Sequence, residues 1–327
     1  MSKFDKLRYL YEIGGGHLVA YKMLDKLLGG RRSAKYLYET YECMNPTKYP
    51  EVLSKLYEYR FGRKLDLENP KTYTEKIQWM KLYDSNPLKT KLADKYLVRD
   101  WVSMKIGEKY LVPLLGVWDD FDDIDFEKMP NKFVLKCNHG SGMNVIVQDK
   151  KTMDMVSIRE KFKVWMNTNY AYLGSFEMHY KNIQKKIIAE EYMTNGGDDL
   201  YDYKFWCDNG HCDFIMFLSE RKDGLKMNNY DRDWNLLPFT YDYEQSKRLI
   251  PKPDNLSEMI KLAETLAKDF SHVRVDFYRL NDGSIKFGEM TFTSASGLMH
   301  WNPKEYDEKI GALINLNLEE KKRTTNI

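Results

Sequence analysis

Two dipeptides that contain glycine constrain the fold of this 327-residue chain most strongly. Asn209-Gly210 and Asp282-Gly283 each separate two apolar, strand-like runs. Such pairs favour the positive φ angles of two-residue hairpin turns, so each predicts two antiparallel strands joined by a tight turn. Antiparallel strands argue against a doubly wound parallel sheet.

Strand-like and helix-like segments alternate along the rest of the chain. The expected strands are residues 132–136, 144–148, 187–193, 201–207, 212–218, 273–280 and 284–290. Residues 256–270 place apolar side chains such as Met259 and Leu266 at helical spacing. The pattern is typical of an α+β protein.

Helix signals dominate the first hundred residues. Thr72 and Glu75 have the spacing of a capping box at a helix start. Residues 88–104 continue in the same style, and Gly107 is a suitable helix stop. A mostly helical N-terminal region is therefore expected.

The composition excludes several classes of protein. Hydrophobic residues make up 43% and charged residues 31%, which is typical of a globular chain. No apolar run approaches the roughly 20 residues of a membrane helix, and the N-terminus lacks the features of a signal peptide. Four cysteines are too few for a disulfide framework. A cytoplasmic protein is expected.

The charge is unevenly distributed along the chain. A net charge of +2 argues against a nucleic-acid-binding protein that relies on a broad basic surface. Residues 1–65, however, hold 13 Lys and Arg against 7 Asp and Glu. This excess forms either a solvated helical face or a surface attracted to anionic lipid headgroups or an anionic polymer. The second reading predicts peripheral association with the inner face of the membrane.

The second hairpin brings two acidic side chains together. If residues 282–283 form a two-residue turn, Asn281 lies opposite Ser284, and counting outward places Asp276 opposite Glu289. Their Cβ atoms would then lie ~4.5–5.5 Å apart, which is destabilising without a compensating charge. A cation between the two carboxylates is the expected remedy.

The same counting identifies the neighbours of this pair. Arg274 falls opposite Thr291 on the acidic face, while Val273 and Val275 point to the other face. Carboxylate oxygens favour Mg²⁺ or Mn²⁺, and Mg²⁺ completes its shell with water and phosphate oxygens. The alternative is a solvent-facing pair with Arg274 or Lys286 as its counter-ion.

A glycine-containing loop joins two expected strands in the sequence FVLKCNHGSGMNVIV. The loop residues are His139, Gly140, Ser141 and Gly142. Glycines let backbone N–H groups approach a phosphate, and Lys136 would add a positive charge beside them. An ordinary hairpin loop fits the same residues, so the loop alone is a weak signal.

A third segment, KKIIAEEYM, is an apolar strand that ends in Glu190 and Glu191, and Asp202 and Lys204 follow it. Such a strand end suits an adenosine pocket, because a purine packs on apolar surface while its amine and the ribose hydroxyls need acceptors. An exposed acidic strand end is the alternative, and it is expected for one of the two glutamates.

Taken in order, these segments resemble the ATP-grasp superfamily from about residue 92 to residue 309. KLADKYLVRDW matches the opening motif, whose lysine, here Lys95, contacts ATP phosphate. FVLKCNHGSGMN matches the second phosphate-binding lysine, Lys136, and its flap. IIAEEY matches the adenine-side hinge with Glu190.

The last two motifs, VRVDFY and FGEMTFTSASG, resemble the closing part of the module. They carry Arg274 and the metal carboxylates Asp276 and Glu289. Thr291 stands where many members have an asparagine that helps to bind a second metal, and a hydroxyl is a weaker ligand. The resemblance therefore implies at least one Mg²⁺ or Mn²⁺.

The closer match is the TupA-like ATP-grasp family, which occurs with bacterial surface-polysaccharide and capsule genes. YRFGRKLDLENPKTYTEKIQWMKLYD, LADKYLVRDWV, FVLKCNHGSG, IIAEEYM, DYKFWCDNG, VRVDFY and GEMTF are similar to its hallmarks. The resemblance implies antiparallel sheets around an ATP cleft. The expected parts are a basic helical region (1–90), an N-terminal subdomain with a flap at 137–144 (91–195), a C-terminal subdomain with the metal site (196–318) and a tail (319–327).

The resemblance also implies an activity. Members of the superfamily join a carboxylate to an amine through an acyl phosphate made from ATP, so we expect a ligase that acts on a uronic-acid-containing glycan precursor. Nucleotide contacts are expected from Lys95, Lys136, His139, Gly140, Ser141, Gly142, Glu190, Glu191, Asp202 and Lys204, and phosphoryl-transfer roles from Arg274, Lys136 and Lys204. His300 and the aromatic residues 170–180 are candidates for the acceptor site or for core packing.

Two other activities fit the same residues. The ATP site of a kinase could phosphorylate a sugar hydroxyl or a carboxylate and release the product. A glycosyltransferase, or an accessory protein of a polysaccharide assembly system, could hold a sugar nucleotide through carboxylates and metal. Protein-kinase and Walker motifs are absent from the sequence.

Overall fold

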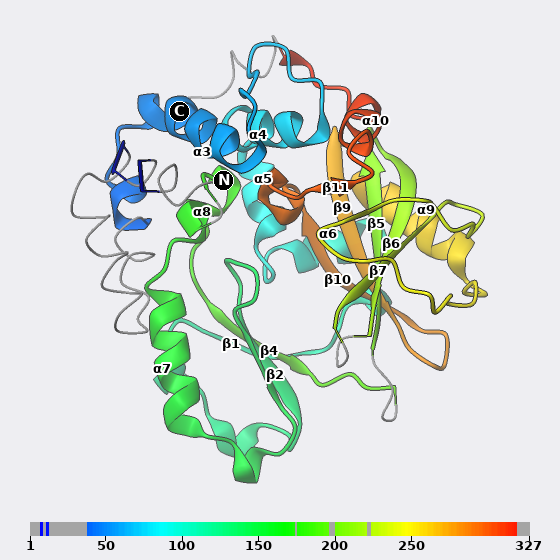
Figure 1. Ribbon diagram of the computed structural model, residues 1–327. Coiled ribbons are helices and arrows are strands. Elements are labelled where there is room, and N and C mark those ends of the chain that lie inside the picture. Colours follow the sequence, from blue (N-terminus) through cyan, green and yellow to red (C-terminus); the bar gives the residue numbers. More distant parts are fainter. Residues whose placement is uncertain are drawn as a thin grey trace.

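The structure is a computed structural model that describes residues 7–8, 11–12, 38–173, 175–195, 200–220 and 224–318. It is an α+β protein with three antiparallel sheets, and the helices of its N-terminal region precede the first strand, so the expected fold class is confirmed (Figure 1). The expected tail at residues 319–327 and most of the basic segment before residue 38 lie outside the described residues.

A four-stranded sheet forms the lower part of the molecule as drawn in Figure 1. Its strands are β1 (Leu114–Trp118), β2 (Phe133–Cys137), β3 (Asn144–Val147) and β4 (Ile187–Glu191), in the order β1-β4-β2-β3. Helix α7 (Met155–Met166) contacts β2, and Phe133, Leu135 and Phe162 belong to the core between them. This sheet presents the flap loop between β2 and β3.

A five-stranded sheet carries the second half of the site. Its strands are β5 (Tyr201–Asp208), β6 (His211–Ser219), β7 (Lys226–Tyr230), β9 (His272–Arg279) and β10 (Ile285–Thr291), in the order β10-β9-β5-β6-β7. Alternate residues serve different cores, because Phe205 and Val275 join one cluster and Trp206 joins another. The strands β8 (Thr240–Tyr241) and β11 (Trp301–Asn302) form a small sheet beside it.

Helices cover both faces of the five-stranded sheet. Besides α7, the α-helices that lie wholly in the described residues are α3 (Tyr49–Phe61), α4 (Tyr73–Tyr83), α5 (Pro87–Ala93), α6 (Val98–Lys105), α8 (Tyr170–Leu173), α9 (Leu256–Ala267) and α10 (Tyr306–Leu313). Short 3₁₀ helices are η1 (Pro46–Lys48), η2 (Glu108–Tyr110), η3 (Phe121–Asp123), η4 (Phe126–Lys128), η5 (Lys150–Thr152), η6 (Met178–Tyr180) and η7 (Ser294–Gly297). Helix α9 contacts β5, β6 and β9, whereas α4 and α10 pack on the opposite face through Tyr73, Trp206 and Ile310.

The N-terminal helix signals are confirmed in the described residues. Thr72 and Glu75 form the capping box of α4, and Gly107, with φ of +111°, follows the end of α6. The helical stretch expected over residues 88–104 is divided, because the Asp94 carboxylate accepts hydrogen bonds from the next backbone N–H groups and interrupts the helix between α5 and α6. The interruption contains Lys95.

The two hairpin predictions have different outcomes. Asn209-Gly210 forms the expected two-residue turn, with φ of +52° and +80° between the paired residues 208 and 211. At the second hairpin the expected pairing of Asn281 with Ser284 is wrong. The Leu280 N–H donates to the Ser284 carbonyl, so the turn contains three residues, 281–283.

A bulge at Gly288 corrects the register of this hairpin. Phe287 pairs with Phe277, but Glu289 pairs with Asp276, so one residue of β10 has no partner in β9. A Cβ at position 288 would lie 3.1 Å from the Asp276 carbonyl oxygen, which explains the glycine. The predicted pairing of Asp276 with Glu289 is therefore confirmed, because the extra turn residue and the bulge compensate each other.

None of the helices in the described ranges has the length and apolar character needed to cross a membrane.

The capping box gives a test of how α4 is held. Thr72→Ala removes the oxygen that accepts the Glu75 N–H, at 3.3 Å, so the free energy of unfolding should fall by about 1 kcal/mol in urea denaturation. Thr265→Ala is the control, because its hydroxyl donates only to the Lys261 carbonyl in α9, and the change should stay within about 0.5 kcal/mol. Equal losses in the two variants would contradict this account.

Candidate active site

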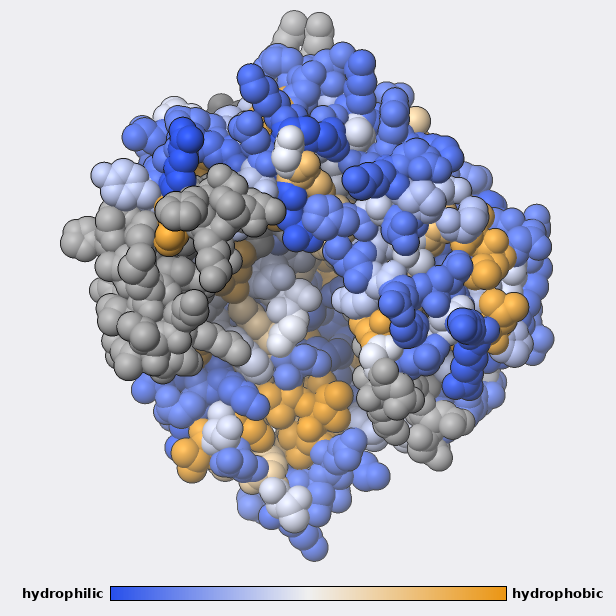
Figure 2. Space-filling view, viewed as in Figure 1, coloured by the Kyte–Doolittle hydropathy of each residue, from blue (hydrophilic) through white to orange (hydrophobic). Residues whose placement is uncertain are grey.

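A polar cavity lies between the two large sheets. Its lining comprises Lys95, Lys136, Ser141, Gly142, Met143, Asn144, Asp202, Lys204, Asp276, Tyr278, Gly288 and Glu289. In the view of Figure 2 the molecular surface is hollowed above the four-stranded sheet, and apolar surface borders this hollow. The cavity therefore joins residues that the sequence predicted for phosphate, ribose and metal.

Asp276 is the most heavily bonded carboxylate of the cavity. The Arg274 guanidinium donates to both of its oxygens, from Nε at 2.7 Å and from Nη2 at 2.8 Å. The Lys204 ammonium lies 2.5 Å from Asp276 Oδ2 and 2.6 Å from Asp202 Oδ2. Although burial opposes its charged form, Asp276 and Asp202 raise the pKa of Lys204, so it stays protonated.

Glu289 reaches the same guanidinium from β10. Arg274 Nη2 donates to Glu289 Oε1 at 2.9 Å, and the Thr291 hydroxyl donates to the same oxygen at 3.1 Å. The Lys95 ammonium lies 4.0 Å from Oε2. Burial alone would raise the pKa of Glu289, but Lys95, Arg274 and Lys204 lower it to about 2, so the group is an anion at neutral pH.

The four-stranded sheet supplies a second set of ion pairs. The Lys136 ammonium lies 2.6 Å from Glu190 Oε2, and Arg99 Nη1 lies 3.1 Å from Glu190 Oε1. Glu190 is buried at the end of β4, whereas Glu191 is exposed. Glu190 therefore positions Lys136 in this structure, and one glutamate is exposed as the sequence suggested.

Lys95 connects the helices to the flap. It lies in the break between α5 and α6, where its backbone N–H donates to the Asn138 carbonyl at 3.0 Å. Its ammonium donates to the Gly140 carbonyl of the flap. Burial lowers the pKa of Lys95, and the neighbouring Glu289 opposes this effect. The lysine therefore ties three segments of the site together.

The flap residues divide into two groups. Ser141 and Gly142 line the cavity, whereas His139 does not. The His139 ring is buried, with Nε2 3.1 Å from the Trp165 carbonyl oxygen, and burial lowers its pKa to about 4. His139 is thus a neutral group at the base of the flap.

The aromatic acceptor candidates lie close to the flap. The Tyr170 ring covers Gly140, because a Cβ there would meet the ring at 2.6 Å, and Tyr170 packs edge-on against Tyr180 at 4.8 Å between ring centroids. His300 lies elsewhere, in a separate cavity that also contains Phe61 and Lys304. The structure brings Tyr170 against the flap, although it is not among the residues that line the cavity, and leaves His300 apart from the site.

A strained turn follows the strand that carries Glu289. Ala295 and Ser296 have φ of +47° and +55°, a region that L-residues seldom occupy. The Gln78 amide of α4 holds the turn by donating to the carbonyls of Ser296 and Gly297, at 3.2 and 2.8 Å. Helix α4 therefore holds the backbone turn that follows the strand of Glu289.

Sequence reasoning missed several residues of the site. Arg99 had no assigned role, although it bonds Glu190 and the Val112 carbonyl. Tyr278 was also missed, although the strand period places it on the face of Arg274 and Asp276. The period of two could have identified Tyr278, whereas nothing in the sequence relates Arg99 to Glu190.

The acidic cluster has the donors of a magnesium site. In the described ranges no three His, Cys, Asp or Glu side chains gather as a complete metal cage. Mg²⁺ needs only one or two carboxylates and takes its other ligands from water and phosphate, so Asp276 and the ionised Glu289 fit it. A metal on Asp276 must displace Lys204 or Arg274 from one of its oxygens.

Comparison with known families classifies the chain. The family model described as TupA-like ATPgrasp matches residues 75–315. The chain belongs to the TupA-like ATP-grasp family. A search of curated protein sequences finds no match.

Solved structures resemble this TupA-like protein in fold. D-alanine–D-alanine ligase from Bacillus anthracis, complexed with ATP, is 15% identical with a TM-score of 0.45, over 73% of this chain and 70% of that one. L-amino acid ligase from Bacillus licheniformis is 14% identical with a TM-score of 0.40, over 66% and 44%. N5-carboxyaminoimidazole synthetase from Staphylococcus aureus, complexed with ADP, is 15% identical with a TM-score of 0.35, over 62% and 44%.

The neutral His139 makes the stability of this TupA-like protein sensitive to acid. The unfolded chain takes up a proton near pH 6.5, whereas folded His139 stays neutral down to about pH 4, so its contribution is complete above pH 6.5 and is lost as the pH falls towards 4. Urea denaturation of His139→Gln should show a stability loss between pH 6.5 and 5 that is smaller than the wild-type loss by about 1–2 kcal/mol.

The exposed His211 provides the matched control for this measurement. His211→Gln should keep the wild-type dependence of stability on pH. If His139→Gln also keeps it, His139 is not the buried neutral group described here.

Proposed function

We propose that this protein is an ATP- and Mg²⁺-dependent carboxylate–amine ligase that acts through an acyl phosphate. The observation that carries the proposal is one cavity lined by three lysines and two facing carboxylates, with Arg274 joining the carboxylates. Cations on opposite walls suit the phosphates of a nucleotide that lies between the sheets. Membership of the TupA-like ATP-grasp family supports the same reading.

The chemistry follows from the reluctance of a carboxylate to react with an amine. The substrate carboxylate attacks the γ-phosphorus of ATP, the bond to the bridging oxygen breaks, and ADP leaves. The amine then attacks the acyl carbon, inorganic phosphate leaves, and the amine proton passes to solvent or phosphate. Both steps require positioning and charge neutralisation rather than a protein nucleophile.

Charged side chains of the cavity have distinct parts in this proposal. Lys95 and Lys136 contact phosphate oxygens from the flap side, and Lys204 does so from the five-stranded sheet. Arg274 is not among the residues that line the cavity, and it acts by holding Asp276 and Glu289 in place. Ser141 and Gly142 close over the phosphates, and Glu190 acts through Lys136, which it holds at 2.6 Å. The apolar surface beside the hollow receives the adenine (Figure 2).

Asp276 and Glu289 are the proposed metal ligands, and Mg²⁺ bound there supplies positive charge next to the transferred phosphoryl group. Lys204 then leaves Asp276 and turns to the phosphates, while Asp202 keeps it near the site. Thr291 supports Glu289 by donating its hydroxyl hydrogen. Residues 170–180, which reach the flap through Tyr170, border the acceptor.

The proposed carboxylate substrate is a uronic acid of a surface-polysaccharide precursor, and the proposed amine is an amino acid or a simple amine. This choice rests on the resemblance to proteins that occur with surface-polysaccharide genes. The test is ADP release by the full-length protein with ATP and Mg²⁺ across uronic acids and amines, with mass spectrometry of the products. An amide together with free phosphate is the expected result.

Other products of this screen would identify the alternatives. A stable phosphorylated sugar or carboxylate would identify a kinase. Thermal stabilisation by Mg²⁺ with UDP-sugars in preference to Mg²⁺ with ATP would point to a glycosyltransferase or an accessory protein, and either result would overturn the ligase proposal.

Replacing one metal carboxylate should stop turnover. Glu289→Gln should lower Mg²⁺-dependent ADP formation by about 10²-fold or more, since it removes an ionised ligand from the transferred phosphate. The protein should remain folded, with a loss of at most about 3 kcal/mol set by the depressed pKa of Glu289. Glu160→Gln, at an exposed glutamate of α7 outside the cavity, is the control; an unchanged rate in Glu289→Gln would remove the metal assignment.

Lys136 is expected to act on binding more than on folding. Lys136→Ala should raise the dissociation constant of ATP about 10- to 100-fold in equilibrium dialysis, because a charged hydrogen bond contributes roughly 1.5–3 kcal/mol. Lys186→Ala is the matched variant, since that lysine pairs with Asp119 outside the cavity. An affinity equal to that of the wild type would reject the phosphate role of Lys136.

The basic N-terminal region suggests peripheral membrane contact. Residues 1–65 carry the excess of positive charge, and most of those before residue 38 lie outside the described residues. Binding to vesicles that contain anionic phosphatidylserine should be measurable by co-sedimentation and should weaken as salt is raised from 50 to about 500 mM. Equal binding to neutral phosphatidylcholine vesicles would refute the idea.

A further inference from the structure

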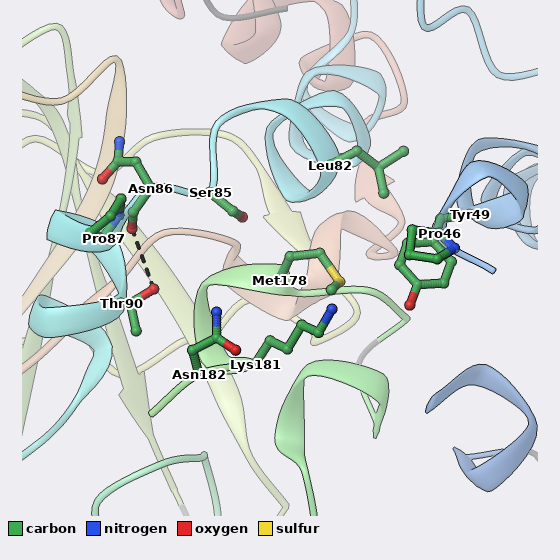
Figure 3. A pocket seen from close by; sticks show the side chains of 10 residues that line it. All are labelled: Pro46, Tyr49, Leu82, Ser85, Asn86, Pro87, Thr90, Met178, Lys181 and Asn182. Atoms are coloured by element: carbon green, nitrogen blue, oxygen red, sulfur yellow. Dashed lines mark hydrogen bonds between the residues drawn. The ribbon is translucent and has the colours of Figure 1, made fainter. Parts of the chain in front are cut away.

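A second cavity lies among the helices, outside the cleft lined by Lys95, Lys136 and Lys204 (Figure 3). It has a volume of about 300 Å³, which falls at the lower end of the range of small-molecule sites. Its lining comprises Pro46, Tyr49, Leu82, Ser85, Asn86, Pro87, Thr90, Met178, Lys181 and Asn182. The residues come from the start of α3, the end of α4, α5 and the segment around η6.

The polar groups of this cavity can form further hydrogen bonds or ion pairs with a ligand. In the part of the chain that the structure describes, neither the Lys181 ammonium nor the Asn182 amide has a hydrogen-bond or ion-pair partner. The hydroxyls of Ser85 and Thr90 donate to backbone carbonyls at 3.0 and 3.3 Å, so their oxygens can accept. Asn86 uses its side-chain oxygen on the Lys89 N–H, which leaves its NH₂ group to donate.

The remaining walls are apolar. Leu82 and Tyr49 are almost fully buried, and Met178 is partly buried next to them. Figure 3 shows Met178 and Lys181 on one side of the space, with Ser85 and Thr90 across from them. Apolar walls with a few converging polar groups are typical of sites for small molecules.

The charge of the lining favours an acid over an amine. Lys181 is its one charged residue, and the set contains no aspartate or glutamate. Asp84, next to Ser85 in the chain, is buried and bonded to Lys89 at 2.8 Å, so its charge is compensated. A carboxylate would gain an ion pair in this cavity, whereas an ammonium group would find no counter-charge.

The third cavity, which contains His300, does not favour an acid over an amine. It has residues of both signs, among them Lys304, Glu305 and Glu308. Its Arg63 already bonds Glu75 and Asp307, each at 2.8 Å. No single ligand class follows from that set, whereas the cavity around Lys181 selects one.

We propose that the cavity around Lys181 is a second ligand site, and that it binds a small hydroxylated carboxylate about the size of one sugar acid. Lys181 pairs with the carboxylate, and the amides of Asn86 and Asn182 bond the hydroxyls. Leu82 and Met178 pack against the carbon skeleton. Binding at this site requires no ATP, so it does not rest on the ligase proposal.

Two segments of the lining lie next to segments of the catalytic cleft in the chain or in the fold. Helix α5 leads directly into the break that contains Lys95. The short helix η6 ends in Tyr180, whose ring packs on Tyr170 and through it on Gly140 of the flap. A ligand in the cavity would therefore contact α5, which precedes Lys95, and the segment of η6, which packs on Tyr170 beside the flap.

The experiment is titration of the full-length protein with D-glucuronate, without nucleotide, by calorimetry or ligand-observed NMR. Saturable binding is expected, with weaker binding of the neutral D-glucose. Lys181→Met should raise the dissociation constant of glucuronate about tenfold or more, through loss of the charged contact. Lys163→Met, at an exposed lysine of α7 outside the cavities described, should leave it unchanged.

Several outcomes would overturn the proposal. One is the absence of saturable glucuronate binding, and another is equal affinity in Lys181→Met and the wild type. Loss of binding in Lys95→Met together with retention in Lys181→Met would place the acid in the nucleotide cleft instead. Inorganic phosphate that binds as tightly as glucuronate, and through Lys181, would show that the site recognises charge and not a hydroxylated acid. ADP formation is not measured, so these results are independent of the ligase test.

Discussion

The Arg274 guanidinium holds the acidic centre of this protein together. It bonds both oxygens of Asp276 and one oxygen of Glu289, from neighbouring strands whose carboxylates would otherwise repel each other. The Gly288 bulge places those strands in the register that lets Arg274 contact both carboxylates. The geometry of the site therefore depends on one cation and one backbone irregularity.

The other charges of the cleft are compensated in a similar way. Lys204 is held by Asp202 and Asp276, and Lys136 is held by Glu190. Such pairs orient the lysines in advance, which lowers the reorganisation needed when phosphate enters. In the proposed reaction the phosphates bind the lysines and the metal binds the carboxylates. These contacts replace the ion pairs between the lysines and the carboxylates.

The sequence predicted more of this cleft than of its surroundings. The pairing of Asp276 with Glu289 is confirmed because alternation along a strand decides which side chains share a face, even though the turn was wrong by one residue. Strand β7 was missed because it contains the buried Asn228 and Asn229, and asparagine is rare in strands. Burial of His139 could not be predicted, because it depends on the distant Trp165.

Binding of Mn²⁺ in the presence of ADP tests most directly whether these carboxylates form a metal–nucleotide site. Electron paramagnetic resonance would follow Mn²⁺ in the wild type and in Asp276→Asn, with circular dichroism to confirm that the variant folds. The account predicts a protein-bound Mn²⁺ signal in the wild type that the variant loses. The same bound signal in a folded Asp276→Asn would contradict it.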